Sequence, residues 1–256
     1  MQPKPLMRTS AILAAAMFAV GMPIVQWLTG TIAVGQTNLV NDGEQTLEAA
    51  GYAFSIWSLI YLGLLGYAAY QALPSTRETP GLRLLGWPSV IAMAGCGAWL
   101  LAATLDAKWA TVAIITLAAA SLCIPLAKRY PVQTAAEFWL IAAPLSLLAG
   151  WLTIASAINT LTVLTGVGVI TEPTAPVWAA AGLVIVLLLG GGMSFFVKNW
   201  VYPLPIAWGL VAVMVAEQAD RPIIGGLAAA SALILLAMAV WGGTHRTPLL
   251  TQPRQQ

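Results

Sequence analysis

The chain has 256 residues, of which 59% are hydrophobic and 8% charged, and its formal net charge is +2. Soluble domains average about 25% charged residues, so this chain has too few charges to cover a water-exposed surface. The composition argues against a soluble enzyme and against a disordered chain. The small net charge argues against a nucleic-acid-binding protein.

Eight apolar stretches have the length of membrane-spanning helices, which need about 20 residues each. They cover residues 8–30, 51–73, 85–105, 109–127, 138–160, 177–195, 200–216 and 222–243. None alternates with a period of two, as the strands of a membrane barrel do. The sequence therefore predicts an all-α integral membrane protein with about eight transmembrane helices.

The charges between the stretches predict the orientation in the membrane. Nine of the 11 Lys and Arg residues lie on the side that holds both termini. They are Lys4, Arg8, Arg77, Arg83, Lys128, Arg129, Lys198, Arg246 and Arg254. Only Lys108 and Arg221 lie on the opposite side. The positive-inside rule therefore predicts cytoplasmic termini and a multi-pass protein of the cytoplasmic (inner) membrane.

The residue types that usually perform catalysis or proton relay are missing from the centres of these stretches. No Asp, Glu, Lys or Arg falls near the middle of an expected helix, and the one His, His245, follows the last helix. This pattern argues against a proton-coupled pump and against an enzyme. Cys96 and Cys123 lie inside expected helices, as buried thiols do, and indicate neither a disulfide nor a metal site.

The 11 tryptophans fall into two groups. Most lie near the ends of expected helices, where indole rings commonly mark the membrane interface. Four lie about a turn or more inside: Trp57, Trp99, Trp151 and Trp208. An indole N–H at that depth needs a partner, so we expect these four to face other helices or a cavity.

Two expected helices place aromatic, small and polar residues on one face. They are Phe54, Trp57 and Tyr61 on the second stretch, and Trp151, Ala155 and Asn159 on the fifth. Spacings of three and four residues bring such side chains together. A flat ring, a small residue and an amide suit a planar, mostly apolar ligand held by stacking and one hydrogen bond. The alternative, which the spacing alone favours, is an interhelical contact in which Asn159 bonds a neighbouring helix.

These motifs, taken in order, resemble the TspO/MBR family of tryptophan-rich sensory proteins. The run FSIWSLIY at 54–61 resembles that family's second helix. The run WLTIASAIN at 151–159 resembles its fifth helix, whose pattern is W-L-x-x-A-x-x-L-N. Trp99 and Trp109 resemble its third helix and the start of its fourth. The resemblance covers about residues 8–160.

The resemblance implies a TspO-like five-helix bundle over residues 1–160, followed by three additional transmembrane helices and a short tail over 161–256. In the family, the bundle holds tetrapyrroles such as protoporphyrin IX, and sterols in some members, beneath the loop between the first two helices. That loop is about residues 31–50 here. The implied ligand-binding residues are Phe54, Trp57, Tyr61, Trp99, Trp151, Ala155 and Asn159.

The chain also departs from the family pattern. Residues 31–50 lack the family's W-Y-x-x-L-x-K-P run, and Cys96 stands where the family has Asn before the third-helix Trp. The sterol-type pattern after the fifth helix is absent as well. The resemblance therefore supports the bundle more than any one ligand, and a tetrapyrrole more than a sterol.

The function implied is a membrane-embedded sensory or ligand-binding protein for a planar hydrophobic molecule, such as protoporphyrin IX or a heme-like ring. We expect the lipid bilayer and this small ligand as partners, with no nucleic acid, metal or required cofactor, and we leave a homodimer open. One alternative is a multi-helix small-molecule transporter or exporter. Another is an enzyme that acts on the bound tetrapyrrole, for which the sequence offers no general acid or base.

Overall fold

The computed structural model describes residues 5–30, 45–128, 132–197 and 199–244. Regular structure in these ranges is entirely helical. The long helices are α1 (Pro5–Thr29), α2 (Ile56–Ala72), α3 (Pro80–Thr104), α4 (Lys108–Ala127), α6 (Ala143–Gly166), α7 (Ala175–Val197), α8 (Pro203–Glu217) and α9 (Pro222–Thr244). The short elements are the 3-10 helices η1 (Gly51–Ser55) and η2 (Pro74–Thr76), the single turn α5 (Ala135–Glu137) and the π turn η3 (Phe138–Ala142).

The expected all-α membrane architecture is confirmed. Among the described residues, seven helical segments are long and apolar enough to cross a membrane. The eighth, α8, has 15 residues. At 1.5 Å per residue it is about 22 Å long, against a hydrocarbon core of about 30 Å. It is shorter than the expected 200–216 because it begins at Pro203, whose ring suits the first helical position but not the middle of a helix.

The fifth span is longer than expected, since α5, η3 and α6 form one helical segment over 135–166. Thr134 caps its start, because its hydroxyl accepts a hydrogen bond from the Glu137 amide at 3.0 Å. The π turn directly precedes Ala143 and Pro144, and Pro144 has no N–H to donate to the preceding turn. This segment is the most buried of the seven.

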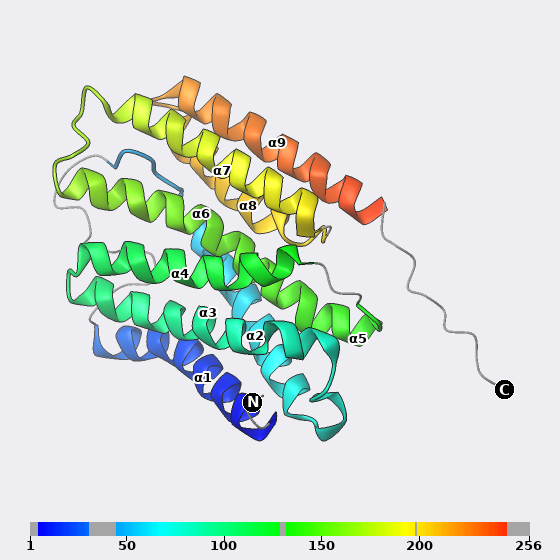
Figure 1. The fold of residues 1–256 in the computed structure, drawn as a ribbon. Helices are drawn as coiled ribbons and strands as arrows, with labels where there is room; N and C mark the ends of the chain where they lie inside the picture. The colour runs from blue at the N-terminus through cyan, green and yellow to red at the C-terminus, as the bar shows by residue number, and fades with distance from the viewer. Residues whose placement is uncertain (1–4, 31–44, 129–131, 198, 245–256) are drawn as a thin grey trace.

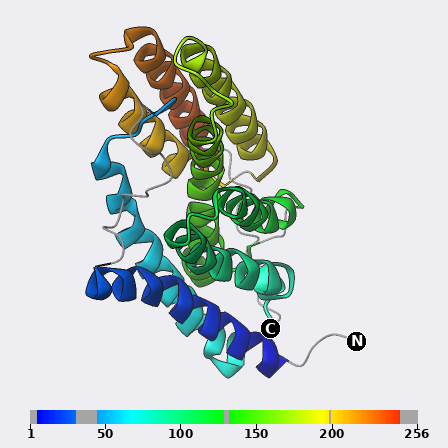
Figure 2. The ribbon, with the colours of Figure 1, turned by 90° about the vertical axis from the view of Figure 1, so that its left-hand side faces the viewer.

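Helix α6 lies at the centre of the molecule. Packed pairs run from α1 through α3, α4 and α6 to α7 and α9, while α2 and α8 both contact α6 from the same side (Figures 1 and 2). Helix α1 begins and α9 ends at the same end of the bundle (Figure 1). The division expected at residue 160 stays a prediction, and α6 itself continues to Gly166.

One glycine allows α6 and the start of α8 to pack closely. A Cβ atom at Gly150 of α6 would collide with the backbone carbonyl of Tyr202 and approach the ring of Pro205. Any larger residue would therefore push the start of α8 away from α6.

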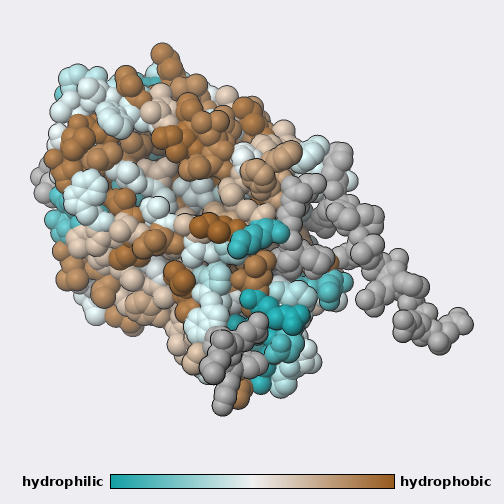
Figure 3. Space-filling model, in the orientation of Figure 1, coloured by the Kyte–Doolittle hydropathy of each residue, from teal (hydrophilic) through white to brown (hydrophobic). Residues whose placement is uncertain are grey.

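The outer surface is apolar over broad areas. Hydrophobic side chains cover the middle of the face seen in Figure 3, while hydrophilic ones gather toward its two sides. Large exposed residues include Leu62 on α2 and Val177 on α7, which are 69% and 71% exposed. Soluble proteins rarely expose such continuous apolar areas, whereas contact with lipid requires them.

Candidate ligand-binding site

A cavity of about 480 Å³ lies between α1, α2, α3, α4, α6 and α8. Small-molecule pockets usually measure about 300–1,000 Å³, so its size suits a small organic ligand. The structure brings all seven residues expected from the sequence to its wall: Phe54, Trp57, Tyr61, Trp99, Trp151, Ala155 and Asn159. Phe54 reaches it from η1 and the other six from α2, α3 and α6.

Four aromatic rings form a corner of this cavity. The Trp57 and Trp151 rings lie 6.3 Å apart at 83° to each other. Tyr61 stacks on Trp57 at 5.1 Å, and Phe54 meets Trp151 edge-on at 6.3 Å. A flat ligand in this corner can stack on one ring and meet the other with its edge, which are the two geometries that aromatic pairs favour.

The Asn159 side chain lines the cavity and also bonds to a neighbouring helix. Its Nδ2 donates to the Thr111 hydroxyl of α4 at 3.1 Å. The Thr111 hydroxyl donates its own hydrogen to the Lys108 carbonyl at 2.6 Å, so toward Asn159 it acts as an acceptor. This fixes the orientation of the amide. Its Oδ1 is buried and has no partner among the described residues.

A second lining group, the Trp99 indole, holds a buried Nε1 that also has no partner within the described ranges. Gln26 lines the cavity as well, but its amide donates to the Leu100 carbonyl at 3.1 Å and to the Thr104 hydroxyl at 2.9 Å. The cavity wall therefore includes two side chains, Asn159 and Trp99, that each hold one buried polar atom without a partner among the described residues. Buried polar atoms are normally satisfied, so these two are exceptions in the packing around the cavity.

The segment 45–53, which we call the cap segment, closes one side of the cavity. Five of its residues line the wall: Gln45, Glu48, Ala49, Gly51 and Ala53. The last part of the expected capping loop, about 31–50, thus lies at the cavity. Its residues 31–44 lie outside the described part of the chain.

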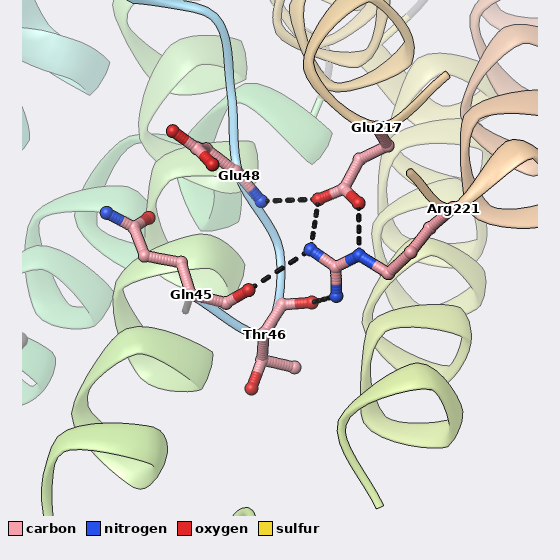
Figure 4. Close-up of polar contacts among 5 residues, drawn as sticks. All are labelled: Gln45, Thr46, Glu48, Glu217 and Arg221. Atoms are coloured by element: carbon pink, nitrogen blue, oxygen red, sulfur yellow. Dashed lines mark hydrogen bonds and ion pairs between the residues drawn. The ribbon is translucent and has the colours of Figure 1, made fainter. Parts of the chain in front are cut away.

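Two charged residues near the turn between α8 and α9 hold the cap segment. The Arg221 guanidinium pairs with the Glu217 carboxylate, with nitrogen–oxygen distances of 2.6 and 2.8 Å. Arg221 also donates to the backbone carbonyls of Thr46 and Gln45 at 2.9 and 3.1 Å. The carboxylate in turn accepts from the Glu48 amide at 2.8 Å. All three guanidinium nitrogens are therefore in use (Figure 4).

Helix α8 adds further contacts to the same segment. The Ala50 amide donates to the Ala212 carbonyl, and the Trp208 indole donates to the Ala53 carbonyl, each at 3.0 Å. The Tyr52 ring packs edge-on against Trp208, 5.3 Å away. The deep position of Trp208 thus has a structural reason, since its N–H is satisfied by the cap segment.

The Glu217 carboxyl, the last residue of α8, is almost fully buried. Burial raises its pKa above the ordinary 4.5, while the Glu48 amide and the Arg221 charge lower the pKa again in part. Arg221 and the Glu48 amide thus oppose the effect of burial by favouring the charged form of this carboxyl.

Sequence reasoning missed several lining residues, among them Gln26, Glu48 and Gly209. The Glu217–Arg221 pair has the spacing of four that joins side chains along a helix, so local spacing could have revealed it. Its bonds to a segment about 170 residues earlier in the chain leave no such local signal.

Comparison with known protein families shows the family of this chain. A model of the family described as TSPO-like protein matches residues 11–241. The chain belongs to the TSPO-like family. The resemblance stated from its motifs is confirmed, and the match extends through α7, α8 and most of α9. Comparison of this TSPO-like protein with curated proteins and with solved structures returned no match.

Proposed function

We propose that this TSPO-like protein is a membrane-embedded ligand-binding protein of the sensory type, and that its ligand is a planar hydrophobic molecule such as a tetrapyrrole. One observation carries the proposal. Seven residues chosen from two helix-face patterns and a deep Trp line a single cavity, although they come from η1, α2, α3 and α6. A cavity with aromatic walls and a few free polar atoms is the usual form of a small-molecule site.

The proposed roles follow from the geometry. The perpendicular rings of Trp57 and Trp151 hold the flat body of the ligand. Ala155 leaves room for its edge, and Asn159 and Trp99 place polar side chains beside it.

The proposal includes the location of the protein. The excess of Lys and Arg in one set of connections supports the cytoplasmic membrane with both termini inside. In that orientation the cap segment faces the outer side of the membrane. A ligand then enters or leaves the cavity near the outer surface.

Fluorescence titration tests the proposal. The probe is protoporphyrin IX dimethyl ester, a neutral tetrapyrrole, added to detergent-purified protein while tryptophan emission is recorded. We expect saturable quenching, and an affinity at least about tenfold lower in Trp151→Ala, because a buried aromatic contact is lost. Trp109→Ala is the matched control, since Trp109 is 58% exposed and lies outside the cavity wall. Absent saturation, or equal affinities in the two variants, would contradict the proposal.

A further inference from the structure

The cavity has an uncompensated negative charge at its wall. Glu48 is the one charged side chain among the described residues that line the cavity. Figure 4 shows this side chain pointing away from the Arg221–Glu217 pair. Glu48 contacts that pair through its backbone amide, which donates to the Glu217 carboxylate. Within the described ranges, no Lys or Arg forms an ion pair with the Glu48 carboxylate.

The nearby cations are already neutralised by other acids. Arg221 is held by Glu217 and by two backbone carbonyls of the cap segment. Lys108, one helical turn before the Thr111 that anchors Asn159, lies 3.9 Å from the Asp106 carboxylate. Each of these pairs has no net charge, so the unbalanced charge beside the cavity is that of Glu48.

The aromatic walls favour the same sign of ligand charge as Glu48 does. The faces of Trp57, Tyr61 and Trp151 carry the negative side of the ring quadrupole, which attracts cations.

We propose that the cavity selects a planar hydrophobic ligand that is neutral or cationic where it faces Glu48, and that it disfavours a ligand that bears a carboxylate there. This inference rests on the proposed function and narrows it. A neutral or cationic planar molecule binds well, whereas an anionic molecule of the same shape binds less well. A carboxylate group would meet the Glu48 charge with no cation in the wall to offset it.

Three probes that share one ring system and differ in charge test the inference. They are 9-(aminomethyl)anthracene, which is cationic at neutral pH, the neutral 9-methylanthracene, and the anionic anthracene-9-carboxylate. Anthracene quenches tryptophan emission, so all three can be titrated in the same way into full-length protein in a non-ionic detergent. Each probe is compared only between variants, because its partitioning into detergent is the same for all of them.

The decisive variant is Glu48→Gln, which removes the charge from an exposed side chain and keeps the backbone amide that contacts Glu217. Glu172→Gln is the matched control, because Glu172 is also exposed and lies outside the cavity wall. We expect Glu48→Gln to lower the affinity for the cationic probe and to raise the affinity for the anionic probe, each by about fivefold. The neutral probe should change less than about twofold, and Glu172→Gln should leave all three affinities unchanged.

Other outcomes overturn the inference in distinguishable ways. If wild-type protein binds none of the three probes saturably, the proposed cavity function fails as well. If the probes bind but Glu48→Gln changes none of the affinities, or shifts all three in the same direction, only the charge preference is wrong. An equal charge-dependent change in Glu172→Gln would assign the effect to net charge rather than to the cavity.

Discussion

The Asn159 amide takes part in the packing of the bundle and belongs to a residue of the cavity wall. Because Thr111 accepts from Nδ2, the orientation of the amide is fixed, and Oδ1 is left without a partner among the described residues. The two interpretations that the sequence left open, an interhelical bond and a ligand contact, therefore use different atoms of one side chain. The interhelical bond is present, and the ligand contact stays a prediction.

Replacing this amide should affect binding more than stability. Asn159→Leu keeps the branched shape and removes both polar atoms, and Thr111 retains its bond to the Lys108 carbonyl. Since the variant loses one interhelical hydrogen bond and also removes one unsatisfied buried oxygen, we expect the free energy of unfolding to change by less than about 1 kcal/mol. We expect the affinity for an N–H-bearing ligand such as 9-(aminomethyl)anthracene to fall by about fivefold. Thermal unfolding and fluorescence titration measure the two effects, and a large loss of stability with unchanged affinity would contradict the assignment.

Between elements, the most informative contact joins α8 and the turn after it to the cap segment. The Glu217–Arg221 pair, the Ala50–Ala212 bond and Trp208 all hold this segment, which also lines the cavity. Helix α8 and the turn after it therefore take part in shaping the candidate site. Their packing against the cap segment gives the last part of the chain a structural role.

Removing the guanidinium should loosen this contact. Arg221→Ala leaves the almost fully buried Glu217 without its partner and removes two bonds to backbone carbonyls. We expect a loss of about 2–4 kcal/mol in the free energy of unfolding, because breaking a buried pair leaves a group that is costly to bury. Lys108→Ala, which breaks the looser Lys108–Asp106 pair, should cost less than about 1 kcal/mol. Equilibrium unfolding in detergent compares the two, and similar losses would contradict the role given to Arg221.

The sequence predicts the elements and the aromatic wall better than the cap. Apolar runs bounded by Pro, Gly and charges locate the spans within a few residues, because lipid imposes length and composition on each helix separately. Spacings of three and four place Trp151, Ala155 and Asn159 on one face for a similarly local reason. The contacts of Glu48 and Arg221 depend on how α8 packs against the cap segment, and no local pattern contains that information.

At the scale of the whole molecule, α8 decides the topology. It runs from the end of α7 back to the start of α9. As a result, α1 begins and α9 ends at the same end of the bundle (Figure 1). We expect α8 to make the eighth pass together with the turns on either side of it, because it has only 15 residues. An even number of passes would then place both termini on one side of the membrane.

Reporter fusions test this topology. We expect a fluorescent-protein fusion at each terminus to be active in the cytoplasm, and an alkaline phosphatase fusion at each terminus to be inactive there, because Lys and Arg cluster on that side. Phosphatase inserted after residue 220, in the turn between α8 and α9, should be active. Termini on opposite sides would show that α8 does not cross.

We propose that one cavity, bounded by the aromatic corner and the cap segment, binds a planar hydrophobic ligand. The most direct test is the absorbance titration of wild-type protein, Ala155→Phe and Ala110→Phe with protoporphyrin IX dimethyl ester. Ala155 lines the cavity, whereas Ala110 on α4 is exposed and does not, so both variants add the same ring but only one fills the site. We expect one bound tetrapyrrole per chain in wild type and in Ala110→Phe. We expect none in Ala155→Phe, although this variant retains its thermal stability. Unchanged binding in a folded Ala155→Phe would contradict it.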